Sequence, residues 1–481
     1  MDWGSSLTYL AQASVKDQTV TFGIKDMDRL EHMCVIGRTG NDRMAFLARM
    51  ILEDVHRGIG VVLLDTTGTL SRLVMERILD DMKDRLIYLD PADGEYPYSW
   101  NPVDDYRGLA PEIAAPLLSK AIASAYQIPV SSLTEACASY MLQHESTMLT
   151  FYDLATDESI RDAALKDDDE LKKSLELALA ENAESIEQLH ERGRYVAKDS
   201  LVRNLLGQKD SKFTMAKLEE HAIVIVDFSR IKMFPTRMTP LVRMFVHATE
   251  ARAHEHADPV GLYLNDCLRY LEEGDIDLIF TKHAVMTCIS DTFYNDTDRE
   301  LREKTVSRAG SIVAFAPNPG DVATVERVFY PYITAEELGK VEEGEFIIAL
   351  TIDAIRSRPF FARVIPLSSR SSLSEQDLMG VSRDRYTLPR LKVDQLFKSS
   401  AMIGKEMPMK DAPPGTFTDT FRSIFSKRSG DQPLAKGEQQ KKQSISPSDM
   451  KTTQKSAQTE IPENDLKTML RVDSGKAFDK E

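Results

Sequence analysis

Residues 37–44 read GRTGNDRM and lie between the apolar run HMCVI and the helical pattern AFLARMILEDV. The stretch has the outline of a phosphate-binding P-loop, G-x-x-x-x-G-K-[ST]. In such a loop the glycines expose backbone N–H groups to phosphate, the lysine reaches the outer phosphates and the hydroxyl binds Mg²⁺. The last glycine, the lysine and the hydroxyl are replaced here by Asp42, Arg43 and Met44.

The three replacements change the chemistry that the turn can offer. Asp42 brings a negative side chain to the place where phosphate lies against bare backbone. Arg43 keeps a positive charge on a larger planar group, and the thioether of Met44 is a poor ligand for a hard cation. We expect ATP–Mg²⁺ binding to be lost or severely weakened, so no cofactor is expected unless nucleotide binding survives. The residues of this degenerate loop are Gly37, Arg38, Thr39, Gly40, Asn41, Asp42, Arg43 and Met44.

Short β-branched runs recur along the chain and lead toward turn or helix signals. Continuous apolar runs that alternate with helical segments are typical of parallel strands covered on both faces. The sequence therefore predicts an α/β fold with a largely parallel sheet. The expected strands are TVTFGI (19–24), HMCVIG (32–37), GVVLLD (60–65), RLIYLD (85–90), AIVIVDF (222–228), GLYLND (261–266), AVMTCIS (284–290), SIVAFAP (311–317), EFIIALTI (345–352) and RPFFARVIPL (358–367).

Two long segments differ from this pattern. Residues 108–218 have helical spacing and predict an inserted all-α subdomain, because an unstructured loop of that length is uncommon. From residue 396 large apolar residues become scarce, which predicts a disordered tail. Two apolar islands in the tail, 416–425 and 464–472, are either docking peptides or incidental clusters. The expected division is 1–107 and 219–395 for the two parts of the core, 108–218 for the insertion and 396–481 for the tail.

The overall composition limits which cellular compartments and binding partners we expect. The 481 residues carry a net charge of −16, which argues against broad coating of nucleic acid but leaves room for a local basic channel. The four cysteines form no C-x-x-C pair and fit buried thiols in a reducing compartment. No signal peptide or apolar run of membrane-spanning length is visible, so we expect a cytoplasmic protein without membrane insertion.

The order of segments around the glycine turn resembles one group of ATPases. SLTYLAQASVKDQTVTFGIKDMDRLEHMCVIGRTG, then GVVLLDTTGTL, then DRLIYLDPADGEYPYSWNPVDD resemble the start of HerA–FtsK-type motors, and most closely the TraG/TraD-like coupling ATPases of type IV secretion and conjugative DNA transfer. LVRNLLGQ, EFIIALTIDAIRSRPFFARVIP and VSRDRYTLPR resemble later segments, so the similarity runs from about residue 6 to about residue 395. It implies a RecA-like P-loop NTPase core with an all-α insertion.

The resemblance also implies where a second catalytic element would lie. In this family the Walker B strand ends in an Asp that holds Mg²⁺ and a Glu that activates water, and the matching strand here is GLYLND. Asn265 takes the Asp position and Asp266 the Glu position, so we interpret them as a vestigial Walker B and assign no catalytic residue. Ile289 and Ser290 stand where a polar sensor is expected. The family's D-P-x-G is Asp65-Thr66-Thr67-Gly68 here.

Other candidates have ordinary alternatives. Arg203 is a candidate for an arginine that reaches into a neighbouring subunit's site. An ordinary arginine on a helix surface explains it at least as well. His247, His254 and His256 lack the rigid spacing of a metal site and fit a solvated helix end, so no metal is expected. We interpret Trp100 as a packing anchor and not as a platform for base stacking.

Taken together, these patterns predict a pseudo-ATPase of the type IV coupling or HerA–FtsK group that acts as a structural or regulatory subunit. Its expected partners are an active ATPase paralogue or the secretion and conjugation machinery, in a ring oligomer with possible DNA contact in the channel. Two alternatives stay open. One is an active but atypical ATP-dependent DNA translocase, and the other is a protein-interaction scaffold with no nucleic-acid role.

Overall fold

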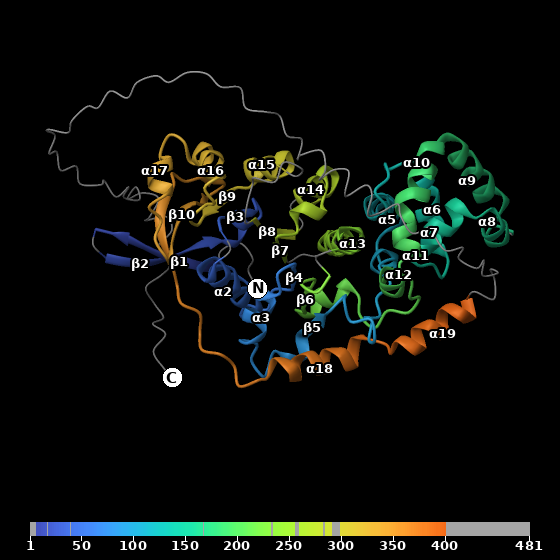
Figure 1. The fold of residues 1–481 in the computed structure, drawn as a ribbon, viewed down its shortest axis with the longest axis horizontal. Helices are drawn as coiled ribbons and strands as arrows, with labels where there is room; N and C mark the ends of the chain where they lie inside the picture. The colour runs from blue at the N-terminus through green and yellow to red at the C-terminus, as the bar shows by residue number, and fades with distance from the viewer. Residues whose placement is uncertain are drawn as a thin grey trace, which may run out of the picture. The chain divides into compact units, whose positions relative to one another are not determined.

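The computed structural model describes residues 6–16, 18–38, 40–166, 168–231, 234–254, 259–281, 284–290 and 299–400 (Figure 1). The predicted tail lies outside the described residues from 401 onward. Eleven strands within the described ranges form one sheet, in the order β2-β1-β13-β10-β9-β3-β8-β7-β4-β6-β5. They are β1 (Leu7–Val15), β2 (Gln18–Lys25), β3 (Met33–Ile36), β4 (Val61–Asp65), β5 (Leu86–Leu89), β6 (Ile223–Asp227), β7 (Val260–Asn265), β8 (Ala284–Ser290), β9 (Ser311–Ala314), β10 (Glu345–Ala349) and β13 (Phe360–Val364).

The sheet is mixed, and its parallel part runs from β9 to β5. The pairings of β3 with β8 and β9, of β7 with β4 and β8, and of β6 with β4 and β5 are all parallel. Parallel strands end at the same edge, so the carboxyl ends of β3, β8, β7 and β4 lie together.

The other edge of the sheet is antiparallel, so the sheet is largely but not wholly parallel, as expected. Strand β1, absent from the expected set, pairs antiparallel with β2 and β13, and β10 pairs antiparallel with β9 and β13. Only two residues separate β1 from β2, and a connection this short joins antiparallel strands. The run EFIIALTI also divides, because its end forms β11 (Thr351–Ile352), which pairs with β12 (Ile355–Arg356) in a separate ribbon.

Helices cover both faces of the sheet, because alternate strand residues point to opposite sides. In β4, Val61 and Leu63 join one apolar cluster, while Val62 and Leu64 join the other. The first cluster includes residues of α2 (Asn41–His56), α3 (Thr69–Met75) and α18 (Glu375–Tyr386). The second includes residues of α13 (Pro235–Ala253), α14 (Glu273–Ile279), α15 (Arg299–Arg308) and α16 (Val322–Phe329), which Figure 1 shows on the other side of the sheet from α2 and α3.

The chain between β5 and β6 contains helices and no strand in its described residues. Trp100 is fully buried there and stacks on Phe245 of α13 with ring centroids 4.3 Å apart, so it is a packing residue as expected. The helices are α4 (Asp104–Arg107), α5 (Pro111–Tyr126), α6 (Ser132–Gln143), α7 (Met148–Thr156), α8 (Glu158–Ala164), α9 (Asp169–Glu181), α10 (Ala183–Gln188), α11 (Arg194–Lys198) and α12 (Ser200–Leu206). The remaining helices are α1 (Asp26–Arg29), α17 (Ala335–Leu338) and α19 (Arg390–Ser400).

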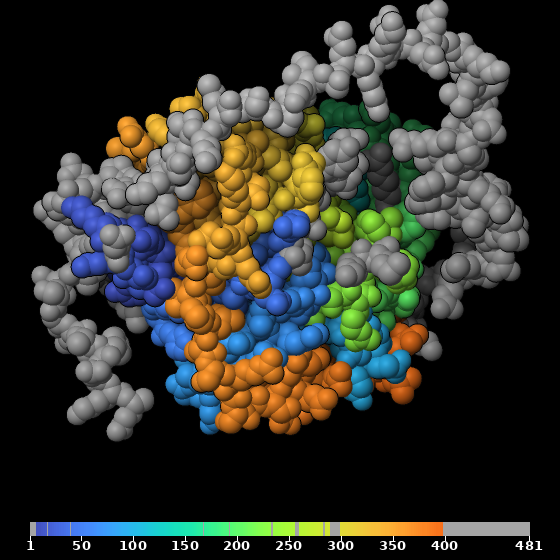
Figure 2. Space-filling model, turned by 60° about the vertical axis from the view of Figure 1, so that its left-hand side comes forward, coloured from blue at the N-terminus to red at the C-terminus, as the bar shows by residue number. Residues whose placement is uncertain are grey.

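Helix α18 covers the edge strand β5. The Ser382 hydroxyl accepts a hydrogen bond from the Tyr88 N–H at 2.7 Å and donates to the Tyr88 carbonyl at 3.0 Å. This one side chain satisfies both backbone groups that an edge strand would otherwise leave open to another chain. In the space-filling view, the orange segment that contains α18 lies along the light-blue residues of the N-terminal part (Figure 2).

A buried ion pair fixes the amino-terminal end of the core. Arg29 donates from both Nη atoms to Asp54 of α2, at 2.6 and 2.7 Å, and the Tyr263 hydroxyl of β7 donates to Asp54 at 2.6 Å. Burial acts to lower the pKa of Arg29, but the Asp54 carboxylate outweighs it and raises that pKa above its ordinary value. The pair therefore joins the segment after β2 to α2 and to the middle of the sheet.

Asp54→Asn should lower the free energy of unfolding by about 3–5 kcal/mol, because it leaves the Arg29 guanidinium buried without its counter-charge. Urea denaturation followed by circular dichroism measures this loss. The control is Asp353→Asn, which removes the exposed partner of Lys25 and should cost at most about 1 kcal/mol. Equal losses in the two variants would show that the buried pair is not a main source of stability.

Candidate functional site

The glycine turn follows β3 directly, in the expected strand–turn–helix order. Gly37 has φ +133°, and a Cβ atom there would lie 2.8 Å from the Cβ atom of Phe315, so only glycine fits. The Arg38 N–H donates to the Ala316 carbonyl at 3.0 Å, which ties the turn to the segment after β9. Gly40 is the N-cap of α2, and Thr39 lies outside the described residues. The described residues therefore confirm the expected order of strand, turn and helix.

Arg43 points back into the turn and is almost fully buried, with 1% of its surface exposed. Its Nη1 atom donates to the Gly37 carbonyl at 2.8 Å, and its Nη2 atom lies 3.9 Å from Oδ2 of Asp266. Asp266 follows β7 directly and has φ +55°. The two residues predicted to replace the lysine and the catalytic glutamate therefore form an ion pair with each other across the strand ends.

The Asp42 carboxylate has a partner outside the turn. Its Oδ2 atom accepts a hydrogen bond from the Gly344 N–H at 2.7 Å, just before β10. Gly344 has φ +78°, a conformation that favours glycine. The Asp42 carboxylate thus fixes the start of α2 to the antiparallel part of the sheet.

Asn265 lies at the end of β7, directly beside Asp65 at the end of β4. Its Nδ2 atom donates to Oδ1 of Asp65 at 2.7 Å and to Oγ1 of Thr67 at 3.0 Å. The Met44 sulfur lies 4.0 Å from the same Nδ2 atom. Asn265 therefore serves as a hydrogen-bond donor to a neighbouring acid, which is a role that an ionised carboxylate at this position could not fill.

Asp65 is the site residue whose role the sequence did not reveal. Its Oδ1 atom also accepts from the N–H and hydroxyl of Thr67, and its Oδ2 atom accepts from the N–H and hydroxyl of Ser71, all at 2.8–2.9 Å. With the bond from Asn265 this makes five, which saturates a carboxylate. The sequence did contain a signal for this role. Asp65 ends an expected strand, and the carboxyl ends of neighbouring parallel strands meet at one edge of a sheet.

These residues do not offer the donors that a Mg²⁺–triphosphate needs. Mg²⁺ requires unencumbered oxygen ligands, and here Asp65 is saturated, Asn265 has no charge and Met44 is buried. The Arg43 guanidinium lies beneath the turn, bonded to the Gly37 carbonyl, so it is not extended toward an outer phosphate. The side chains of Ile289 and Ser290, the expected sensor positions, lie outside what the structure describes.

Arg203, the candidate for presentation to a neighbouring subunit, lies on α12 among the helices of the 108–218 segment (Figure 1). Its guanidinium stacks over the Phe397 ring of α19, with 5.0 Å between the guanidinium carbon and the ring centroid. Its Nε and Nη2 atoms lie 3.4 and 3.3 Å from Oδ1 of Asn204. In this structure Arg203 therefore connects α12 to the C-terminal helix and does not join the other candidate residues.

His247 corrects one expectation. It is buried in α13, not solvated, and its Nε2 atom lies 2.8 Å from Oδ1 of Asp275. His254 ends α13, while His256 lies outside the described residues. No group of three or more His, Cys, Asp or Glu residues in the described ranges is arranged to hold a metal ion.

The thiols are buried as expected. Cys34 of β3 and Cys288 of β8 are register partners with their sulfur atoms 2.8 Å apart. The hydrogen bond to Cys288 and burial both raise the pKa of the Cys34 thiol.

None of the helices that the structure describes is long and apolar enough to cross a membrane.

No family model and no curated protein matches the chain. Among solved structures it is similar to the bacterial conjugative coupling protein TrwBdeltaN70 in its unbound monoclinic form, with a TM-score of 0.50 and 14% identity over 76% of this chain and 90% of that one. The TrwB complex with ADP and Mg²⁺ gives 0.50 and 14% over 75% and 89%. The trigonal form with sulphate gives 0.50 and 14% over 73% and 89%.

At this level of identity the similarity concerns the fold. A mostly parallel mixed sheet covered by helices is shared with TrwB, which confirms the expected RecA-like α/β class. The resemblance to the TraG/TraD-like coupling ATPases is likewise confirmed at the level of the fold.

Asn265→Asp should destabilise the protein at pH 7 by about 3 kcal/mol, because it sets a second carboxyl against Asp65 in a buried position. Repulsion raises the folded-state pKa of the introduced carboxyl above its unfolded value. The folded variant then holds a proton that the unfolded chain releases, so the deficit is smallest near pH 4 and grows toward pH 7. Urea denaturation at several pH values measures it.

Asn265→Leu provides the matched control, since it removes the same donor without adding a charge. Its deficit relative to the unmodified protein should change less with pH than that of Asn265→Asp, because it introduces no titratable group. A deficit of Asn265→Asp that is independent of pH would contradict the donor role assigned to Asn265.

Proposed function

We propose that this protein is a pseudo-ATPase of the type IV coupling group, a structural or regulatory subunit that does not hydrolyse nucleotide. The observation that carries the proposal is the buried position of Arg43, between the Gly37 carbonyl and Asp266. The side chain at the lysine position and the side chain at the catalytic-acid position neutralise each other. Neither is then available for the charge of a triphosphate or for a water molecule.

Nucleotide binding would have to disrupt contacts that the folded protein already makes. Extending Arg43 toward a phosphate breaks its bond to Gly37 and leaves Asp266 without the cation beside it. Mg²⁺ would have to compete for Asp65 with five protein donors. Each broken contact to a charged group costs about 1.5–3 kcal/mol, and these costs oppose binding.

The fold supports the wider assignment. TrwB is a bacterial conjugative coupling protein, and its chain and this one share most of their length. We propose that the protein works beside an active ATPase paralogue or the secretion and conjugation machinery, within a ring or at its edge. DNA contact in a ring channel belongs to the same proposal.

Isothermal titration with ATP and Mg²⁺ tests the central claim. We expect no binding heat at ATP concentrations up to about 1 mM. This concentration is the upper end of the range of KM values that enzymes show for their substrates. Micromolar affinity together with DNA-stimulated turnover would overturn the proposal and favour an atypical ATP-dependent translocase.

Restoring the loop provides the converse test. The triple variant Asp42→Gly, Arg43→Lys, Met44→Ser should gain measurable ATP–Mg²⁺ affinity, because it removes the buried guanidinium and supplies the lysine and hydroxyl. The matched control is Arg43→Met, which removes the guanidinium but restores no phosphate ligand and should stay inactive in the titration. If Arg43→Met alone bound ATP, the remaining loop would be competent and Arg43 would be an inhibitor of an intact site.

A further inference from the structure

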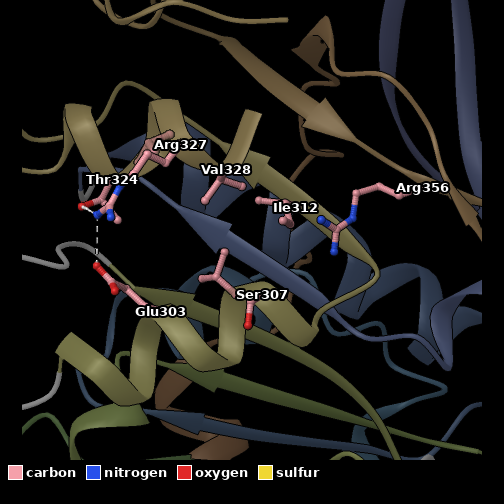
Figure 3. A pocket seen from close by; sticks show the side chains of 9 residues that line it. Glu303, Ser307, Ile312, Thr324, Arg327, Val328 and Arg356 are labelled. Carbon is pink, nitrogen blue, oxygen red and sulfur yellow. Dashed lines mark hydrogen bonds and ion pairs between the residues drawn. The ribbon is translucent and has the colours of Figure 1, made fainter. Parts of the chain in front are cut away.

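A pocket with an apolar floor lies between α15 and α16, away from the glycine turn (Figure 3). Its volume is about 310 Å³, within the range of sites that hold small ligands or a few side chains. Val306, Val325 and Val328 line it together with Ile312 of β9. A partly open apolar pocket of this size costs free energy when water fills it, so it favours an apolar occupant.

The rim of the pocket is positively charged on one side. Arg356, on β12, donates from Nε to the Gly310 carbonyl at 2.9 Å and from Nη2 to the Ala309 carbonyl. Carbonyls hold this guanidinium in place but do not neutralise it, and no carboxylate in the described ranges forms an ion pair with it. Figure 3 shows the Arg356 guanidinium directed toward Ile312.

The opposite rim carries a salt bridge that is open to solvent. Arg327 of α16 lies 3.3 Å from Glu303 of α15, and 64% of the Arg327 side chain is exposed. Exposed pairs of this kind contribute little to stability and exchange partners readily. An incoming carboxylate could therefore pair with Arg327 as well as with Arg356.

Two exposed aromatic residues follow α16, the helix that forms one wall of the pocket. Tyr330, directly after α16, is 77% exposed, and Tyr332 is 44% exposed beneath the Arg358 guanidinium. Tyrosine and arginine are the residues enriched where proteins bind other chains. The pocket and its surroundings thus have the composition of a peptide-binding surface for an apolar, acidic segment.

We propose that this pocket binds residues 460–472 of the same molecule, EIPENDLKTMLRV. Leu466, Met469 and Leu470 recur at i, i+3 and i+4, a sequence spacing that would bring three apolar side chains to one face if the segment forms a helix when it binds. Glu460, Glu463 and Asp465 precede or flank that face and outnumber the two bases of the segment, Lys467 and Arg471, so its net charge of −1 complements the arginines of the rim. The apolar side chains enter the pocket, and the acids pair with Arg356 and Arg327.

Charge separates this segment from the other apolar island of the tail. TFTDTFRSIF, at 416–425, is followed by Ser426, Lys427 and Arg428, so its flank is basic and would meet Arg356 with like charge. The length of the connecting chain does not prevent residues 460–472 from reaching the pocket. The roughly 60 residues between Ser400 and Glu460 span up to about 200 Å when extended, so the segment can reach any point on its own molecule.

Photo-cross-linking in the full-length protein tests the proposal. Benzoylphenylalanine replaces Ser307, an exposed residue that lines the pocket, and mass spectrometry identifies the cross-linked peptide. We expect cross-links within 460–472, in a product with the mass of one chain. The double variant Leu466→Ser, Leu470→Ser should reduce their yield at least about tenfold.

The matched control changes the other island, with Phe417→Ser and Phe421→Ser, and should leave the yield unchanged. Circular dichroism of each variant checks that the core stays folded. Cross-links to 416–425, products with the mass of two chains, or a yield insensitive to Leu466 and Leu470 would each overturn the proposal. A failure here would leave the nucleotide titration unaffected, because the pocket shares no residue with the glycine turn.

Discussion

The parallel register of β3, β8, β7 and β4 is the constraint on which the candidate site depends. It brings the carboxyl ends of these strands to one edge, so the residues that follow β3 and β7 meet although more than 200 positions separate them. Ligand sites of α/β proteins commonly arise at such an edge for the same reason. Here the edge holds an amide, a methionine, a saturated acid and an internal ion pair. The strand–turn–helix order expected from the sequence is thus present at this edge, with these side chains around it.

The side chains at this edge depend on one another. Asp65 receives five hydrogen bonds, and the one from Asn265 requires an amide or another donor at that position. An acid at position 265 would add negative charge beside Asp65 without offering it a proton at neutral pH. The amide at position 265 and the saturation of Asp65 therefore belong to one hydrogen-bonded arrangement. Reversing either change alone would leave a buried polar group without its partner.

The sequence predicted the strand–turn–helix frame, the burial of Trp100 and the buried thiols, because each leaves a local pattern of apolar residues. It did not predict strand β1 or the antiparallel edge, because neighbouring apolar runs do not reveal the direction in which they pair. The partner of Asp42 was also not predicted, since Gly344 is 302 residues away. Arg203 shows the same limit, because its contact with Phe397 joins two helices that no sequence period connects.

Arg43 stands in the first turn of α2, where the helix dipole is positive and a cation is unfavourable. A buried guanidinium at this point needs an acceptor and a negative charge close by. The Gly37 carbonyl supplies the first, and Asp266 supplies the second at 3.9 Å. A phosphate would have met the same positive helix end and the same backbone turn. In this chain Asp266 supplies the negative charge that the buried Arg43 requires, so the residues at positions 43 and 266 depend on each other.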